Sequence, residues 1–307
     1  MSALMPEIPA ISLVICTYNR CKYLPAALES VAAQKCAPGL FELIIVDNAS
    51  TDDTAVIAND FLKSHPELSV RYVFEANKGL SFARNRGRTE AMAPVVAYID
   101  DDVILFEDYV ARLNEFFINY PGASGAGGRV IPKYEHGRPK WMNKYLKGFV
   151  GEVSHGNQIK KFDKGMKYPA GASMIYTKEI LERAGGFNNE LKFRSDDKYI
   201  FYAVSSISDE IYYLPDVQLY HFIDDARLEF DNFKKLFLKT GNEEKRRLAS
   251  AGKSLLPKAF EFMTKTGAAT ALCVLYTLKG QFGKGKMIFL SQWFTLIGFF
   301  KKDVFVR

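Results

Sequence analysis

The 307-residue chain has few of the residues that cross-link small secreted proteins or hold structural metals. It contains four cysteines without any CxxC spacing: Cys16, Cys21, Cys36 and Cys273. A disulfide framework and a zinc site are therefore disfavoured, and a reducing compartment is favoured. Residues 1–10 also lack a charged segment followed by a long apolar run, so we expect no signal peptide and a cytoplasmic protein.

The body of the chain has no excess of positive charge. Residues 226–307 carry 16 Lys and Arg against 6 Asp and Glu, whereas residues 1–225 carry 25 against 29. A nucleic-acid-binding protein is typically basic over its body, so we expect no nucleic-acid partner. A basic tail on a slightly acidic body indicates that the tail alone meets an anionic surface.

The tail has no apolar run long enough for a simple membrane span. Its most apolar segments are 267–278 and 287–300, and 14 helical residues reach about 21 Å against about 30 Å of hydrocarbon. The lysines that flank them are Lys265, Lys279, Lys284, Lys286, Lys301 and Lys302. This pattern predicts that 265–302 binds peripherally to the anionic inner face of the cell membrane. A helical cap, buried on the rest of the chain or in a dimer, explains it equally.

Apolar runs alternate with helical patterns through the first hundred residues. The runs predict strands at 11–15, 41–46, 70–74 and 95–99, and the helical patterns between them lie at 23–34, 54–63 and 80–92. Such βαβ units predict an α/β fold with a doubly wound, mostly parallel, Rossmann-like sheet. Ligands bind at the carboxyl ends of such strands, where this chain has polar clusters: Thr17-Tyr18-Asn19, Asp47-Asn48 and Asp100-Asp101-Asp102.

The pattern changes near residue 123. We predict further strands at 125–131, 170–176, 211–214 and 217–220, and helices at 178–184 and 196–205. Residues 132–168 are irregular, and so long a loop favours a role as a lid or in binding an acceptor. We therefore expect a catalytic domain over 1–225, with halves at 1–122 and 123–225, and a helical extension over 226–307.

The three adjacent aspartates after the fourth strand repel one another unless a cation neutralises them. Carboxylate oxygens suit Mg²⁺ or Mn²⁺, which also bind phosphate oxygens. A solvated acidic turn that caps the next helix is the alternative explanation.

These stretches together resemble glycosyltransferase family 2, whose members are inverting enzymes of the GT-A fold. The matching segments are SLVICTYNR (12–20), LIIVDNASTDDT (43–54), NKGLSFARNRG (77–87), VAYIDDD (96–102), AGASMIYTKEILERAGGF (170–187) and LPDVQLYH (214–221). Each is loose by itself, but their order and spacing are specific over about two thirds of the chain.

The resemblance implies how a nucleotide-sugar donor is bound. Thr17 and Tyr18 match the positions that line the nucleotide base, and Asp47 matches the acid that hydrogen-bonds the base. A helix N-cap is the alternative role for Asp47. Asn77 lies near the third strand end with Lys78, Arg84 and Arg86, where one of them would reach a phosphate, although salt bridges within the helix explain these residues as well.

The resemblance also implies a metal site. Asp100 and Asp102 match the outer residues of the family's DxD motif, with Asp102 as the main ligand of Mn²⁺ or Mg²⁺. Asp100 would also lie near the ribose and phosphates, and Asp101 is counted with it among the residues that bind the nucleotide sugar, without a defined contact. His221 matches a late histidine that completes the metal site in many GT-A enzymes, and a structural histidine is the alternative.

The catalytic stretch departs from the family pattern. The family usually has Glu-Asp at the start of a helix, whereas this chain has Asp196-Asp197 within the stretch 194–198. Asp197 aligns with the catalytic base, and Asp196 takes the place of the glutamate. Both acids would also suit helix capping.

The resemblance implies a metal-dependent inverting transfer of sugar to a hydroxyl acceptor, a glycan or a lipid-linked sugar, in surface polysaccharide or glycolipid assembly. A degenerate nucleotide-sugar-binding scaffold is one alternative. A nucleotidyltransferase is another, although 16–20 lacks the glycine-rich phosphate loop that such an enzyme would bring.

Overall fold

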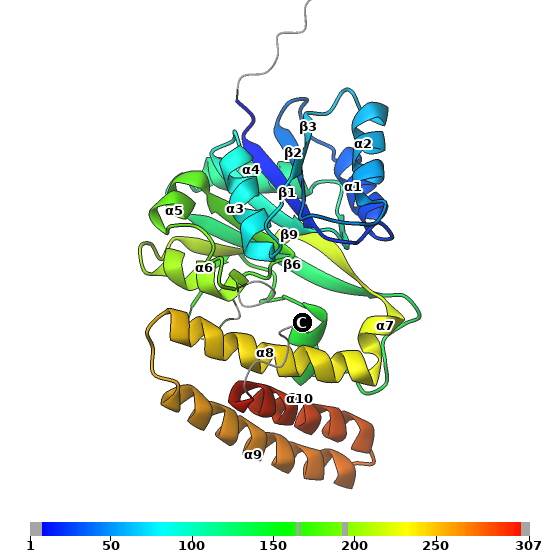
Figure 1. The fold of residues 1–307 in the computed structure, drawn as a ribbon, viewed down its shortest axis with the longest axis vertical. Coiled ribbons are helices and arrows are strands. Elements are labelled where there is room, and N and C mark those ends of the chain that lie inside the picture. The colour runs from blue at the N-terminus through cyan, green and yellow to red at the C-terminus, as the bar shows by residue number, and fades with distance from the viewer. Residues whose placement is uncertain (1–7, 164–165, 167, 192–195, 302–307) are drawn as a thin grey trace, which may run out of the picture. The chain divides into compact units, whose positions relative to one another are not determined.

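The structure is a computed structural model that describes residues 8–163, 166, 168–191 and 196–301. The chain divides into two compact units, and Figure 1 labels their helices and several of their strands. The first unit comprises the described residues up to 132, from 151 to 191 and from 196 to 222. The second comprises 133–150 and 223–301.

One sheet forms the centre of the first unit. Its strands are β1 (Ile11–Thr17), β2 (Phe41–Asp47), β3 (Val70–Phe74), β4 (Val95–Asp100), β5 (Val103–Leu105), β6 (Gly125–Tyr134), β7 (Lys160–Lys161), β8 (Ser173–Thr177) and β9 (Ile211–Ile223). They follow the order β3-β2-β1-β4-β8-β6-β9-β5, and β7 pairs with β9. The sequence therefore predicted β1 to β4 of the first half, but not the short strand β5 that follows the aspartates.

The first four strands are parallel, and their register aligns the predicted polar clusters. Thr17 lies opposite Asp47, and Cys16 lies opposite Asp100. Because parallel strands end at the same edge of a sheet, the loops that follow β1, β2 and β4 meet there. The expected α/β fold with a doubly wound sheet is confirmed.

Helices cover both faces of this sheet, as expected for parallel strands that are buried on both sides. Leu13 and Ile45 face one side with α1 (Leu24–Ala32), α2 (Thr54–Ser64) and α4 (Tyr109–Asn119). Val14 and Ile44 face the other side with α3 (Leu80–Glu90), α5 (Lys178–Arg183) and α6 (Asp196–Ser205). Alternate residues of β1 and β2 thus belong to two separate hydrophobic clusters, which explains why these strands are apolar throughout.

The second half of the sheet is antiparallel. β8 pairs antiparallel with both β4 and β6, and β9 pairs antiparallel with β5 and β7. The predicted strands 211–214 and 217–220 are one strand, β9, with Pro215 between the part paired to β7 and the part paired to β5. Proline donates no backbone hydrogen bond, and the sequence therefore predicted two strands with a break at Pro215. In the structure the strand continues through this residue.

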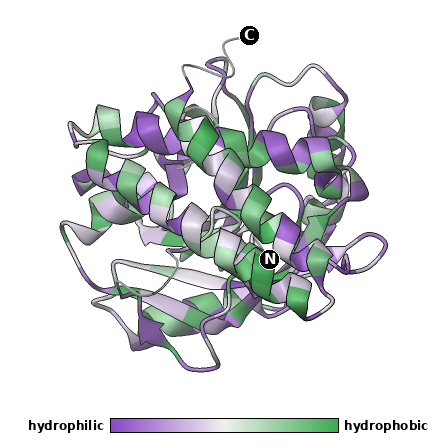
Figure 2. Ribbon diagram, turned by 90° about the horizontal axis from the view of Figure 1, so that it is seen from below, coloured by the Kyte–Doolittle hydropathy of each residue, from purple (hydrophilic) through white to green (hydrophobic). Residues whose placement is uncertain are grey.

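The second unit is helical, as predicted beyond residue 226. It contains the 3₁₀ segment η1 (Lys144–Val150), α7 (Asp225–Leu228), α8 (Phe230–Ser250), α9 (Leu256–Leu278) and α10 (Phe282–Phe300). α10 packs against both α8 and α9. Figure 2 shows hydrophobic and hydrophilic segments alternating along the helices. Within the described residues, no helix has both the length and the apolar composition needed to cross a membrane.

Candidate functional site

The acidic cluster lies at the turn between β4 and β5. β4 is buried up to Ile99, and the chain then exposes part of Asp100 while Asp101 and Asp102 stay buried. Burial raises the pKa of Asp100, and it raises the pKa of Asp101 to about 7. The neighbouring carboxylates contribute to both upward pKa shifts, because like charges disfavour ionisation, whereas Arg84 beside Asp100 and Arg20 beside Asp101 oppose them. A cation bound here would relieve this repulsion.

His221 joins this cluster because β5 and β9 pair antiparallel, which places it opposite Val103. Its Nε2 lies 3.2 Å from Oδ1 of Asp102. Gly151 packs against the ring, and a Cβ at this glycine would lie 2.9 Å from Nδ1 of His221. The close approach, together with a φ of +72°, explains a glycine at this position.

The three predicted metal ligands therefore come together. Each of Asp100, Asp102 and His221 offers a ligand atom within 4.8 Å of the others. Two carboxylates and an imidazole fit a small divalent cation, and the oxygen ligands suit Mn²⁺ or Mg²⁺. The residues present thus match the metal that the sequence motif implies.

Two arginines lie against the same acids. Arg20 donates through Nε to Oδ1 of Asp101 at 3.2 Å and pairs with Asp102 through Nη2. Arg84 lies 3.5 Å from Oδ1 of Asp100 and pairs with Asp196. Arg20 was not among the predicted site residues. It directly follows the polar cluster Thr17-Tyr18-Asn19 at the end of the first strand, and this position could have identified it.

Asp47 is almost completely buried, with 1% of its surface exposed. Its Oδ1 accepts the Ser50 backbone N–H at 2.9 Å, and its Oδ2 accepts the Tyr72 hydroxyl at 2.7 Å. α2 begins at Thr54 with Asp53 as its N-cap, so Asp47 is not the helix cap that was its alternative role. It orders the loop after β2 next to Thr17.

The loops after β1 and β3 meet beside this carboxylate. The Asn48 amide donates to the carbonyl of Asn77 at 2.7 Å, and its Oδ1 accepts the Gly79 N–H. The Asn77 side chain donates to Glu75 at 2.9 Å. Tyr18 is 45% exposed, and Nζ of Lys78 lies 3.3 Å from its hydroxyl. An exposed ring and cation at this edge suit a nucleotide.

Asp196 and Asp197 begin α6, but they lie in different surroundings. Asp196 is buried and ion-paired with Arg84. Asp197 is half-buried, and its Oδ1 accepts the Lys198 backbone N–H at 2.7 Å. The two preceding residues of this motif, 194 and 195, lie outside the described part of the chain.

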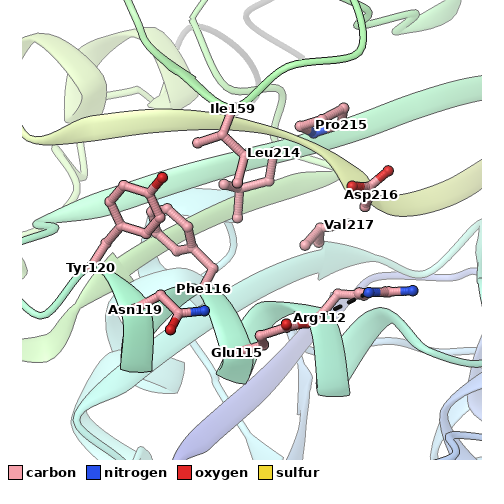
Figure 3. Close-up of a pocket in the computed structure, with 10 residues that line it drawn as sticks. All are labelled: Arg112, Glu115, Phe116, Asn119, Tyr120, Ile159, Leu214, Pro215, Asp216 and Val217. Carbon is pink, nitrogen blue, oxygen red and sulfur yellow. Dashed lines mark ion pairs between the residues drawn. The ribbon is translucent and has the colours of Figure 1, made fainter.

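A separate cavity of about 180 Å³ lies between α4 and β9 (Figure 3). Phe116 and Tyr120 stack there with their ring centroids 4.8 Å apart, beside Leu214 and Val217. None of the residues that line it belongs to the predicted site. The acidic cluster, rather than this cavity, therefore gathers the groups with catalytic chemistry.

Comparison with known proteins places the chain in a family. Residues 12–185 match the family model described as glycosyl transferase family 2. The chain is 25% identical over 233 residues to the glucosyl-dolichyl phosphate glucuronosyltransferase of Haloferax volcanii, covering 72% of each protein. It is 36% identical over 126 residues to a PGL/p-HBAD biosynthesis glycosyltransferase of Mycobacterium tuberculosis, covering 40% of this chain and 47% of that protein. It is 37% identical over 107 residues to a validoxylamine A glucosyltransferase of Streptomyces hygroscopicus, covering 34% of this chain and 23% of that protein.

Solved structures show the same fold. The mannosyltransferase PcManGT from Pyrobaculum calidifontis, in complex with GDP-Man and Mn²⁺, superposes with a TM-score of 0.65 at 15% identity, covering 94% of this chain and 88% of that one. S. aureus TarS 1–349 in complex with UDP superposes with a TM-score of 0.55 at 16% identity, covering 93% and 89%. At these identities the likeness concerns the fold alone.

Proposed function

The chain belongs to glycosyltransferase family 2. We propose that this glycosyltransferase is metal-dependent and transfers a sugar from a nucleotide-sugar donor to a hydroxyl acceptor. The transfer inverts the configuration at the anomeric carbon of the sugar. The observation that carries the proposal is the cluster of Asp100, Asp102 and His221, whose ligand atoms lie within 4.8 Å of one another. The complex of PcManGT with GDP-Man and Mn²⁺ supports a divalent metal and a nucleotide-sugar donor.

The donor would lie along the carboxyl edge of the parallel strands. Tyr18 offers an exposed ring for the base, and Asp47 with Asn77 orders the loops around it. Asp100, Asp102 and His221 would hold a divalent cation, which when bound neutralises charge on the leaving diphosphate. Asp101 and its partner Arg20 lie beside this group.

Asp197 is the candidate base. It stands at the first turn of α6 and is half-buried, whereas the neighbouring Asp196 is buried and paired with Arg84. A base accepts the proton of the acceptor hydroxyl as that oxygen attacks the anomeric carbon from the face opposite the diphosphate. One displacement with one base inverts the configuration.

We further propose that the helical unit binds an anionic membrane surface on the cytoplasmic side, where the acceptor is a lipid-linked sugar or a glycan. The support is one face of α9. Exposed apolar side chains at positions 260, 263, 274 and 278 recur at helical spacing, and Leu278 is 80% exposed. Exposed lysines accompany them: Lys265, Lys279, Lys286 and Lys301. Lys302, which was part of the same prediction, lies outside the described residues.

A thermal-shift screen tests the proposed donor class. UDP-glucose, UDP-GlcNAc and GDP-mannose are each offered with Mn²⁺, with Mg²⁺ and with EDTA. We expect one donor to raise the melting temperature only when metal is present, because a ligand that binds the folded state stabilises it by mass action. Equal shifts with metal and EDTA would contradict metal dependence. Turnover of the selected donor then separates an enzyme from a protein that only binds nucleotide sugars.

A further inference from the structure

Arg84, in the middle of α3, is buried beneath the acids of the site. Only 3% of its side chain is exposed. Its Nη1 donates to Oδ2 of Asp196 at the start of α6, and its Nη2 lies 3.5 Å from Oδ1 of Asp100 at the end of β4. One guanidinium therefore connects two acids that are 96 residues apart in the sequence, as the numbering of Asp100 and Asp196 shows.

The surroundings of Arg84 fix it in this place. A Cβ at Gly171 would lie 2.6 Å from Nη2 of Arg84, so the backbone closes directly over the guanidinium. The ring of Phe187 lies 5.7 Å from Cζ of Arg84. The Tyr98 hydroxyl donates to the Arg84 carbonyl oxygen at 3.2 Å. The guanidinium is thus enclosed from several sides and paired with two acids of the site.

An arginine suits this task better than a lysine. Its planar fork presents donors in two directions at fixed angles, whereas a lysine ammonium acts as a point charge on a flexible stem. A carboxylate as buried as that of Asp196 is costly to leave without a paired cation. The fork therefore fixes the direction of the first residue of α6.

We propose that Arg84 is a positioning residue, which holds the start of α6 against the end of β4 and so sets the place of Asp197 relative to Asp100. This inference rests on the proposed role of Asp197 as the base. A misplacement of about 1 Å at such a base costs up to about a hundredfold in rate. The link between α3, β4 and α6 is made by residues of this chain alone, so it can be tested without substrate.

The first test is hydrogen exchange of the metal-free protein. Arg84→Gln removes the cation, which leaves the buried Asp196 unpaired. Arg84→Gln/Asp196→Asn removes both charges of that buried pair, so only the partly exposed Asp100 is left without Arg84. Arg86→Gln is the matched control, because Arg86 lies on the same helix, is 44% exposed and pairs with Glu90 one turn away. We expect amide exchange over 196–205 to speed up at least about tenfold in the Arg84 variants and not in the control.

The second test is steady-state kinetics with the donor found by the thermal-shift screen. We expect the double variant to lose about ten- to a hundredfold in kcat, with a smaller rise in KM for the donor, because Arg84 also lies 3.5 Å from Asp100, a proposed metal ligand. Arg84→Lys should recover part of the loss.

The outcomes are distinct. Wild-type exchange over 196–205 in the folded double variant would overturn the inference, and so would a raised KM at unchanged kcat, because Arg84 would then bind the donor. If Asp197→Asn keeps full activity, the proposed function fails, and the exchange result still decides whether Arg84 holds α6.

Discussion

At the residue scale, the acids of the site have different partners and therefore different expected roles. Asp102 lies next to both His221 and Arg20. We expect Asp102→Asn to lower Mn²⁺-dependent affinity for UDP at least about tenfold, because one charged ligand is lost. The apo protein should stay folded, since the lost charge also relieves repulsion of Asp100 and Asp101. Calorimetric titration of UDP with Mn²⁺ measures this, and Asp108→Asn, an exposed acid at the start of α4, is the control. Unchanged affinity would remove Asp102 from the metal site.

The two acids of α6 should respond differently to the same change. Asp197→Asn should bind donor normally and lose transfer by at least about a hundredfold, the usual scale for a general base. Asp196→Asn should lose less, because it weakens an ion pair that only positions the helix. Initial rates and donor affinity of both variants measure this. The reversed order of losses would mean that Asp196 is the base.

The sequence predicted these acids but not the arginines that pair with them. Strand-end position is a local property, so Asp47, Asp100 and Asp102 could be found from the apolar runs before them. Which arginine faces which acid depends on how α3 packs on the sheet, and that is a tertiary property. The sequence therefore left Arg84 as one of several basic residues and did not select Arg20.

At the element scale, α8 and α10 cross at two glycines. A Cβ at Gly241 would lie 2.0 Å from the Thr295 carbonyl oxygen, and a Cβ at Gly298 would lie 2.1 Å from that of Leu238. We expect Gly241→Ala to destabilise the protein by about 1–3 kcal/mol, because the helix backbones must separate. Gly267→Ala on α9 is the matched control, since its Cβ meets nothing within 4 Å. It should stabilise by up to about 1 kcal/mol. Urea unfolding of both variants measures this, and equal effects would contradict the close crossing.

Helices and strands with a clear hydrophobic periodicity could be predicted from the sequence. The direction in which a strand pairs with its neighbours could not. The bounds of β3, Val70–Phe74, match the prediction because the apolar run is short and flanked by polar residues. The direction of β8 was not predictable, since no local pattern distinguishes a strand that pairs antiparallel with β4 from one that pairs parallel. Pro215 hid the continuity of β9 for a different reason, because a proline inside a run argues against a continuous strand.

At the scale of the whole molecule, the proposed membrane surface makes a prediction for the intact chain. Each lysine near an anionic surface contributes about 1 kcal/mol to the free energy of membrane binding, and salt weakens this contribution. The contribution of the apolar side chains does not depend on salt in this way. We expect flotation with vesicles that contain phosphatidylglycerol, falling only partly at high salt. Phe260→Ser/Leu278→Ser should abolish it. Ile118→Ser, which removes an exposed apolar side chain of α4, is the control and should float like the wild type. A wild type that ignores vesicles would refute the membrane surface.

The pairing of β5 with β9 also determines the order in which the residues of the proposed cation site come together during synthesis. Asp100 and Asp102 leave the ribosome well before His221, which follows them by roughly 120 residues, or about 6–24 s at ordinary rates of synthesis. The proposed cation site therefore lacks its histidine while the first four strands are already made. A newly made chain would complete this proposed site only after β9 has been added to the sheet, so metal loading would report that the first unit has finished folding.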